Sequence, residues 1–448
     1  MRVSNISVKR LFNTFDHSVP LNLDGRITII HGLNGLGKTT LLRMVKNLCR
    51  ARYSQLEAVP FTEFALDFDD GSAIAVSKNV DDLPPEEPSE KRHPLIIRYT
   101  EGGVEKGHYQ PPHHVESRLK NEIIEWLDRR IPGLDRVAQD RWRYRPTHEM
   151  ISTEQVMERF GDMLPPSLVL TPTNAPEWMQ KLNTSIRVRL IETQRLVMVP
   201  TAQSEYEETG IGPAIVMHSE EFATRIASQE SEYGALSQSF DRTFPIRYVQ
   251  QKTKISMSDE ELRNRFQNLE SKRARLEEAG LLEKEKTGFE LPLEMDEATR
   301  GVMSVYVRDI EEKLSVFDGL AARINLFSQI VNDHFMYKEM RVSKKKGFRF
   351  FSTRTGEELD ATDLSSGEQH EVVLLYELLF HVASNSLIMI DEPEISLHIA
   401  WQEEFLTDLQ HIIKLSPFDA VIATHSPQIV NDRWDLTVEL TGPQEDKK

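Results

Sequence analysis

The sequence predicts an α/β fold whose core is built from both ends of the chain, with helical insertions between them. Near the N-terminus, a short apolar run, a glycine-rich loop and a helical pattern follow one another. Near the C-terminus, an apolar run ends in two carboxylates, and much of the region between has apolar residues at helical spacing. A length of 448 residues exceeds what one simple core requires, so insertions or additional modules are expected.

Composition narrows the class of protein. The net charge of −17, from 54 Lys+Arg against 71 Asp+Glu, argues against a surface coated in basic residues for gripping duplex DNA, although it leaves room for a local basic groove. The single cysteine, Cys49, excludes a disulfide framework and a cysteine-built zinc site. No apolar run reaches the roughly 18 residues of a membrane span, and Met1–Ile6 alternates like a strand. We therefore expect a soluble, cytoplasmic protein without a membrane segment.

Residues 1–110 are expected to form the N-terminal part of the core. Arg26–Ile30 is a short apolar run typical of a buried strand, and a helix is expected to begin after the glycine-rich loop that follows it. Residues 81–88 are acidic and proline-rich, as in a solvated loop. Further strand candidates are Ile6–Val8, Phe64–Phe68, Ile74–Val76 and Leu95–Ile97.

Two insertions are expected in the middle of the chain. Residues 111–183 are predicted to be a mostly helical insertion, and residues 184–215 return to the core through the alternating run Ser185–Ile191. Residues 216–335 are predicted to form a helical arm, before residues 336–448 complete the core. Within the arm, one helix repeats leucine every seven residues, and a second has an a/d seam over 22 residues that would span about 33 Å. The two helices either pair as an antiparallel arm or lie on the body as an amphipathic pair. Their apolar positions are Leu262, Leu269 and Leu276, and Met303, Val307, Ile310, Leu314, Phe317, Ala321 and Ile324.

The glycine-rich loop is a phosphate-binding motif. Residues 32–39, which we call the phosphate loop, match G-x-x-x-x-G-K-[ST] between a strand and a helix, the context that the motif requires. Glycines allow the backbone N–H groups to turn toward a phosphate, and the following helix N-terminus adds a positive dipole end. Lys38 is expected to bind the β- and γ-phosphates, and Thr39 to bind Mg²⁺. The other expected nucleotide-binding residues of this segment are Asn34, Gly35, Gly37 and Thr40.

The second functional feature is the pair Asp391–Glu392, which directly follows the apolar run Ser386–Ile390. Charges at the end of a buried strand are costly unless they are paired or bind a metal. Asp391 is expected to help hold Mg²⁺, and Glu392 to polarise an attacking water close to the γ-phosphate. The pair alone is weak evidence; together with the phosphate loop it is strong.

The segment Leu364–Gln369, with the sequence LSSGEQ, resembles the signature of ABC-type ATPases of the SMC-like subset. In that family the signature contacts ATP bound to the opposite protomer, so the resemblance implies ATP and Mg²⁺ as cofactors and an ATP-sandwich dimer, with ATP hydrolysis as the activity. Hydroxyl groups and free N–H groups at a helix N-terminus can form an anion site. Ser-x-x-Glu is also an ordinary capping box. The residues expected to contact nucleotide here are Ser365, Ser366, Gly367 and Glu368.

Three further positions follow from this resemblance. Glu394–His398 takes the place of the D-loop, and His425, after the run Val421–Thr424, takes the place of the switch histidine that binds the γ-phosphate. Gln194 is the best candidate for the glutamine that senses Mg²⁺ and the attacking water, with Gln203 as a weaker rival. The resemblance thus implies Lys38, Glu392 and His425 as catalytic residues.

The motif variants narrow the kind of ATPase. DEPEISLH at residues 391–398, ATHSP at residues 423–427 and ETQRL at residues 192–196 together resemble ATPases of the overcoming-lysogenisation-defect class. Those proteins usually continue into a Toprim nuclease domain, whereas this chain ends at Lys448, soon after His425. The chain therefore resembles ATPase subunits of two-gene anti-phage systems, first PARIS, with a Toprim effector, and second Septu, with an HNH nuclease. PARIS would imply a ring of subunits that holds the nuclease effector until a phage trigger protein is sensed.

Two other function classes stay open: an SMC-type DNA-repair ATPase, and a nucleotide-gated scaffold with negligible turnover. Residues 141–145, RWRYR, could stack bases but fit a strand or helix face with solvated arginines better. Residues 344–347 fit a hairpin tip between Val342 and Phe348. His113 and His114 lack a second pair of metal ligands, so no metal beyond Mg²⁺ is assigned.

Overall fold

The computed structural model describes residues 1–78, 95–111, 134–138, 141–144, 149–152, 156, 175–192, 196–198, 212–251, 257–282, 291, 295–395 and 397–442. The chain divides into two compact units. The first unit combines residues 1–214 with residues 381–448, and the second unit comprises residues 215–380. The first unit is therefore built from both chain ends, as the sequence predicts.

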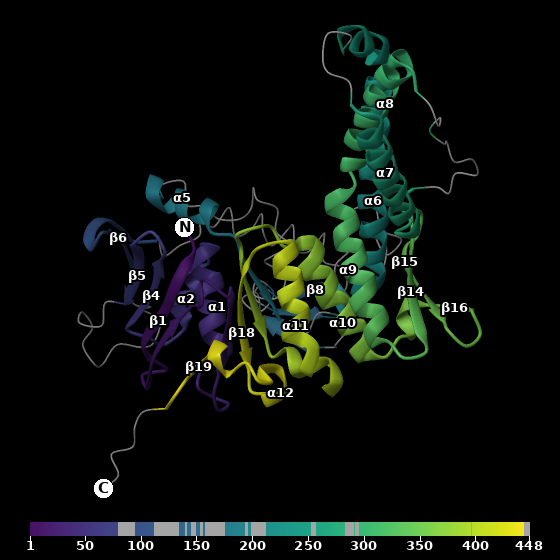
Figure 1. Cartoon of the computed structure of the whole chain (residues 1–448). Coiled ribbons are helices and arrows are strands. Elements are labelled where there is room, and N and C mark those ends of the chain that lie inside the picture. The colour runs from purple at the N-terminus through teal and green to yellow at the C-terminus, as the bar shows by residue number, and fades with distance from the viewer. Residues whose placement is uncertain are drawn as a thin grey trace, which may run out of the picture. The chain divides into compact units, whose positions relative to one another are not determined.

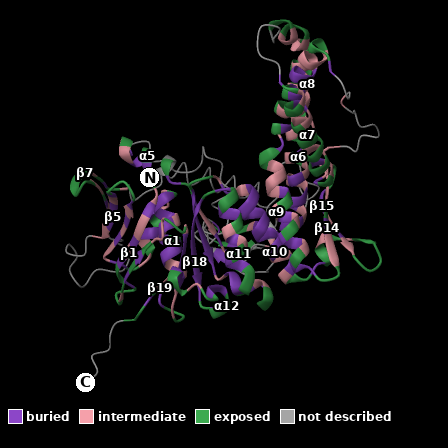
Figure 2. Ribbon diagram, viewed as in Figure 1, coloured by how far each residue is buried: buried purple, intermediate pink, exposed green. Residues whose placement is uncertain are grey.

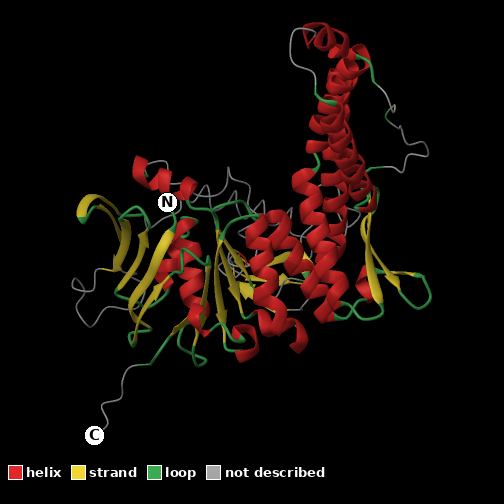
Figure 3. Cartoon of the chain, in the orientation of Figure 1, coloured by secondary structure: helices red, strands yellow, loops and turns green. Residues whose placement is uncertain are grey.

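A five-stranded parallel sheet forms the centre of the first unit (Figures 1 and 3). Its strand order is β11-β17-β18-β3-β19, and each neighbouring pair is parallel. Strand β3 comes from the N-terminal region and β17, β18 and β19 come from the C-terminal region, which confirms the predicted α/β core. The strands are β3 (Ile27–His31), β11 (Val188–Ile191), β17 (Leu387–Asp391), β18 (Asp419–Thr424) and β19 (Thr437–Glu439).

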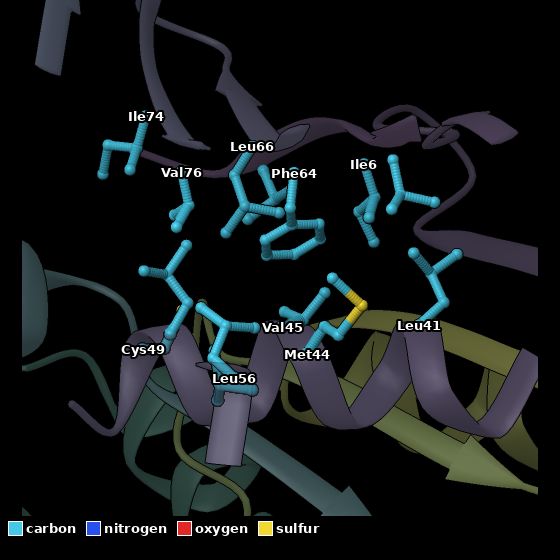
Figure 4. Packing of buried hydrophobic residues seen from close by; sticks show 14 of the residues in the cluster. Ile6, Leu41, Met44, Val45, Cys49, Leu56, Phe64, Leu66, Ile74 and Val76 are labelled. Carbon is cyan, nitrogen blue, oxygen red and sulfur yellow. The ribbon is translucent and has the colours of Figure 1, made fainter. Parts of the chain in front are cut away.

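A second, antiparallel sheet in the same unit covers helix α1 (Lys38–Cys49). Apolar side chains of α1 point toward this sheet, and the short helix α2 (Tyr53–Ala58) adds Leu56 to the same core (Figure 4). Buried residues of β17 and β18 belong to this core as well, so α1 lies between the two sheets. The strands, in sheet order, are β2 (Phe15–Pro20), β1 (Val3–Leu11), β4 (Glu63–Phe68), β5 (Ser72–Lys78), β6 (Leu95–Glu101) and β7 (Val104–Tyr109).

The parallel sheet is buried on both faces, as its nearly continuous apolar strands predict (Figure 2). Leu387 and Met389 of β17 pack into the α1 core, while Ile388 and Ile390, which alternate with them, are equally buried toward the other face. Helix α11 (Ile399–Leu415) makes the crossover from β17 to β18. Short helices then follow each of these two strands at η4 (Pro393–Ile395) and α12 (Pro427–Val430), and η5 (Trp434–Leu436) precedes β19.

The first insertion differs from its prediction. Its described residues between Leu134 and Ser152 form a three-stranded antiparallel sheet, so the prediction of a mostly helical insertion is wrong for them. The alternation Arg141-Trp142-Arg143 has the period of a strand, and Trp142 is fully buried beneath the guanidinium of Arg136. Trp142 is therefore no platform for stacking bases. The elements are β8 (Leu134–Ala138), β9 (Arg141–Tyr144), β10 (Glu149–Ser152) and, later, α5 (Glu177–Ser185), β12 (Val197–Met198) and β13 (Gly212–Pro213).

The second unit contains the helical arm, made of α6 (Ala214–Gln251), α7 (Asp259–Glu278) and α8 (Glu297–Ser315), which lie side by side in Figure 1. No helix among the described residues is both long and apolar enough for a membrane span.

The directions of the arm helices correct the predicted pairing. Arg300 binds Asp259 at 2.6 Å and Arg265 binds Glu311 at 3.3 Å, so α7 and α8 run parallel. The two helices that carry the predicted seams therefore do not form an antiparallel pair with each other. The antiparallel partner of α8 is α6, because residues 241 and 247 pair with residues 313 and 309. An apolar seam identifies the face that packs but not the direction of the neighbouring helix.

At the base of the arm, α9 (Asp318–His334) leads into a three-stranded sheet and helix α10 (Ser366–Tyr376). The predicted seam helix is interrupted here, since α8 ends at Ser315 and α9 begins at Asp318. The hairpin of β14 (Lys338–Ser343) and β15 (Gly347–Ser352) pairs Val342 with Phe348, which confirms the predicted tip, and β16 (Glu358–Leu359) completes the sheet. Phe222, Phe327, Phe348, Tyr376 and Phe380 form an aromatic core. Residues 336–380, which we assigned to the ATPase core from sequence, therefore pack in the second unit.

Candidate functional site

The phosphate loop connects β3 to α1 with the backbone that its glycines allow. Gly35 and Gly37 have φ of 88° and 89°, in the left-handed region that favours glycine. A Cβ atom at Gly37 would lie 2.6 Å from Leu11 Cδ2 and 3.3 Å from Phe12 Cε2, whereas a Cβ at Gly35 would meet nothing within 4 Å. Gly37 is therefore required by close packing against the β1–β2 turn as well as by its dihedral angle. Leu11 and Phe12 were not identified from sequence, because their role depends on a contact across the fold.

The Lys38 side chain is hydrogen-bonded to the backbone of its own loop. Its ammonium group donates to the carbonyl oxygens of Gly32, at 2.8 Å, and Leu33, at 3.2 Å, and its side chain is buried. These bonds hold the charge inside the loop, where an arriving phosphate would find it. Asn34 and Gly35 are exposed at the loop tip, and Thr40 is half-buried in the first turn of α1.

Thr39 and Asp391 provide two adjacent oxygen atoms. The Thr39 hydroxyl donates to Asp391 Oδ1 at 3.0 Å, although these residues lie at opposite ends of the chain. Burial raises the pKa of Asp391 to about 6, and the nearby charge of Glu392 acts in the same direction, while the bond from Thr39 opposes the shift. Hydroxyl and carboxylate oxygens are the ligands that Mg²⁺ prefers, so this pair fits a Mg²⁺ ion.

Glu392 follows β17 in a strained backbone conformation. Its φ is 44°, which is uncommon for a residue other than glycine, and its N–H is bonded to Ala423 O at 2.8 Å. This bond fixes the turn against the neighbouring strand. Strained residues of this kind concentrate at functional sites. The Glu392 side chain remains partly exposed, at 26%, as expected of a group that has to reach a water molecule.

His425 follows β18, next to the carboxylates. Its Nδ1 lies 3.8 Å from Glu392 Oε1 and 3.1 Å from Glu394 Oε1, and 45% of its side chain is exposed. The ring is therefore held on its Nδ1 side by acidic groups.

The sheet register brings these residues to one edge. Asp391 on β17 pairs with Ala423 on β18, and Thr424 pairs with His31 on β3. The carboxyl ends of three neighbouring parallel strands thus supply Asp391–Glu392, His425 and the phosphate loop. In open α/β sheets, ligands bind at this edge.

Some predicted site residues cannot be placed. Gln194, its rival Gln203, and the pair His113–His114 lie outside the described residues. Glu192, two positions before Gln194, is 3.7 Å from Arg43 and 3.8 Å from Lys46 of α1.

The signature segment, residues 364–369, belongs to the second unit. Ser365 is the N-cap of α10 and forms a complete capping box with Glu368, while Ser365 and Ser366 are exposed and Gly367 is half-buried. Burial raises the pKa of Glu368, but the hydrogen bonds from Lys338 and Ser365 together lower it by more than burial raises it. The pKa of Glu368 is therefore below its usual range. The Glu368 carboxylate is thus buried, bound to Lys338 at 2.6 Å and engaged in the cap of α10, and its contact with nucleotide stays a prediction.

Comparison with known proteins finds one family model that is similar to the C-terminal part of the chain. Residues 209–431 match the family model described as "AAA domain, putative AbiEii toxin, Type IV TA system". The matched stretch includes the signature segment, Asp391–Glu392 and His425. No curated protein matches the chain.

Solved structures of Smc heads show weak similarity. The Smc head domain with an extended coiled coil bound to the C-terminal domain of ScpA, from Pyrococcus furiosus, is 13% identical at a TM-score of 0.35, over 99% of this chain and 96% of that chain. The SMC head domain from Thermotoga maritima is 10% identical with a TM-score of 0.34, and the match covers 98% of this chain and 95% of that chain. The SmcHead bound to the C-winged helix domain of ScpA is 10% identical with a TM-score of 0.33, and the match covers 100% of this chain and 99% of that chain. Similarity at this level says nothing about function.

Proposed function

We propose that the chain is an ABC-type ATPase that binds and hydrolyses ATP, closes into dimers on it, and acts as the sensor and scaffold subunit of a two-gene anti-phage system. The observation that supports the ATPase activity best is the convergence of Lys38, Thr39, Asp391, Glu392 and His425 at one edge of the parallel sheet. The match to an AAA-type domain agrees with it.

Each residue has a defined task in this proposal. The phosphate loop and Lys38 bind the phosphates, and Thr39 and Asp391 hold Mg²⁺. When bound, Mg²⁺ supplies charge neutralisation at the phosphate oxygens. Glu392 orients the attacking water and accepts its proton, and His425 binds the γ-phosphate. Gln194 assists at Mg²⁺ and the water. Ser365, Ser366 and Gly367 bind the nucleotide of the opposite protomer, so that two heads close only when ATP is present.

Three variants test the ATPase activity. Glu392→Gln should retain ATP binding and lose turnover by about 100-fold or more, because the amide cannot accept the proton. Lys38→Ala should lose ATP affinity. Glu403→Gln, at an exposed carboxylate of α11, is the matched control and should behave like the parent. Hydrolysis by Glu392→Gln at the parental rate would show that another group activates the water.

ATP-dependent dimerisation tests the sandwich. Glu392→Gln with ATP and Mg²⁺ should sediment as a dimer or a higher ring, and Lys38→Ala should not. A monomer under both conditions would contradict the role assigned to the signature segment.

The scaffold role rests on the PARIS-like motifs and on the acidic balance, which suits a protein partner better than a DNA duplex. The proposal predicts that a neighbouring gene encodes a nuclease and that co-expression with it yields a complex, with a Toprim protein for the PARIS-like proposal and an HNH protein for a Septu-like one. Toxicity that appears only when a phage protein is added would identify the trigger. Tight DNA binding without a partner, with a steep dependence on salt, would instead favour a DNA-repair ATPase.

A further inference from the structure

Glu394 is a buried acidic residue beside the proposed catalytic groups that has not been assigned a task above. It lies in the short helix η4 after Glu392, and only 6% of its side chain is exposed. From sequence it could be placed only as part of the D-loop.

Glu394 makes three contacts at the end of β18, one with Thr424 and two with His425. Its Oε1 accepts hydrogen bonds from the Thr424 hydroxyl, at 2.7 Å, and from the backbone N–H of His425, at 2.9 Å. The same oxygen lies 3.1 Å from Nδ1 of the His425 ring. One carboxylate oxygen therefore determines where the backbone of His425 lies and also faces its imidazole.

This arrangement is costly if its purpose is only to stabilise the fold. Oε2 of Glu394 is buried and has no hydrogen-bond partner among the described residues. A buried carboxylate with one unsatisfied oxygen loses hydration that three contacts on the other oxygen only partly replace. A neutral acceptor such as glutamine could take the bonds from Thr424 and from the backbone of His425. The charge has a clear effect only on the third neighbour, the imidazole.

We propose that Glu394 is the positioning residue of His425: its charge keeps a proton on Nδ1 and leaves Nε2 as the ring atom that serves the γ-phosphate. A histidine works through one nitrogen in a defined state only when a partner determines the state of the other nitrogen. Because the His425 side chain is 45% exposed, it has no enclosing packing that would hold the ring by shape alone. This inference rests on the proposed ATPase function and extends it to a residue that does not touch the nucleotide.

The test is a double-mutant cycle in the full chain. Glu394→Gln should lower kcat for ATP hydrolysis about 10- to 100-fold, with KM for ATP changed less than about threefold. His425→Ala should lower kcat by at least as much. In the His425→Ala background, Glu394→Gln should have almost no further effect, because the ring through which Glu394 acts is gone. Equal losses in both backgrounds would overturn the proposal, and so would a parental kcat in Glu394→Gln.

Asp419 provides the matched control. It is a buried carboxylate at the opposite end of β18, where it accepts a hydrogen bond from Arg2 at 2.8 Å. Asp419→Asn should lower the melting temperature and leave kcat unchanged per folded molecule. If it reduced kcat as Glu394→Gln does, loss of packing at β18 rather than positioning of His425 would explain both variants.

A second measurement needs no variant of Glu394. Nitrogen-15 chemical shifts of the histidine rings report which nitrogen carries the proton, and the His425 signals are those missing from His425→Ala. A protonated Nδ1 is expected, and a bare Nδ1 would overturn the proposal even if Glu394→Gln failed to fold. Complete absence of ATP hydrolysis by the parental chain would refute the proposed function instead, and the NMR result would still decide whether Nδ1 of the His425 ring carries the proton that the proposal requires.

Discussion

Substitution of Ser365 by alanine separates two roles of the signature segment. Ser365 is both the N-cap of α10 and the residue proposed to reach the nucleotide of a second protomer. Its hydroxyl donates to Glu368 Oε2 at 2.8 Å, and its oxygen accepts from the Glu368 N–H at 3.4 Å. Ser258 is the matched control, because it caps α7 through the Glu261 N–H at 3.2 Å and has no proposed contact with nucleotide.

The structure gives different magnitudes for the two roles. Loss of an N-cap costs about 1 kcal/mol of unfolding free energy, and Ser365→Ala also removes a hydrogen bond to a buried carboxylate, so about 2 kcal/mol is expected. In a unit of this size, this lowers the melting temperature by about 4–8 °C, against about 2–4 °C for Ser258→Ala. A lost hydrogen bond to a phosphate costs about 1.5–3 kcal/mol, and the proposed symmetric dimer loses two of them, so ATP-dependent dimerisation should weaken by about 150-fold or more.

The assay uses the Glu392→Gln background, in which the ATP-bound dimer should accumulate. Dimer dissociation constants from sedimentation and melting temperatures from calorimetry are measured for Ser365→Ala and Ser258→Ala. We expect both to lose stability and only Ser365→Ala to lose dimerisation. If Ser365→Ala dimerises as tightly as Ser258→Ala, then Ser365 is a helix cap and the proposed sandwich is wrong.

Three further predictions concern glycine packing, pH and thiol reactivity. Gly347 and Gly356 have φ of 72° and 73°, but a Cβ would lie 1.9 Å from Ser219 O at Gly347 and meet nothing within 4 Å at Gly356. In urea unfolding, Gly356→Ala should therefore lower the free energy of unfolding by about 1–2 kcal/mol, and Gly347→Ala should lower it by about 1–3 kcal/mol more than that. Equal losses in the two variants would contradict the close packing at Gly347. Since the pKa of Asp391 is raised from 3.8 to about 6, its carboxyl is protonated below that pH without a cation. Affinity for ATP with Mg²⁺ should fall between about pH 7 and about pH 5, and a flat profile would exclude Asp391 as a ligand. Burial raises the pKa of the Cys49 thiol to about 12, so a disulfide reagent should react only after unfolding, and rapid reaction of the native protein would show that α1 is exposed.

The parts of the fold that sequence predicts well are those determined by local pattern. The strand, loop and helix around Lys38 follow from short-range propensity and glycine chemistry, and the buried strand before Asp391 follows from its apolar run. The hairpin tip at Lys344–Lys346 was predicted for the same reason. The α/β class then follows from the order of these elements along the chain.

The parts that sequence does not predict depend on contacts between distant residues. The parallel direction of α7 and α8 is visible only in ion pairs such as Arg300–Asp259. The packing of Gly37 against Leu11, and the position of Glu394 beside His425, likewise require the folded chain. A periodic apolar seam or a short motif does not specify which distant residues will pack against it.

Two side-chain contacts on one face of α10 have a mechanical consequence. His334, at the end of α9, contacts Glu371, and Lys338, at the start of β14, binds Glu368, one turn earlier on α10. Since α9 follows α8 after only two residues, these contacts link the base of the arm to the helix that the signature serine caps. A protein that bends or rotates the arm would therefore move Ser365 directly, in the manner of a lever. Force applied at the arm and the proposed nucleotide contact of the signature would then act on the same compact unit.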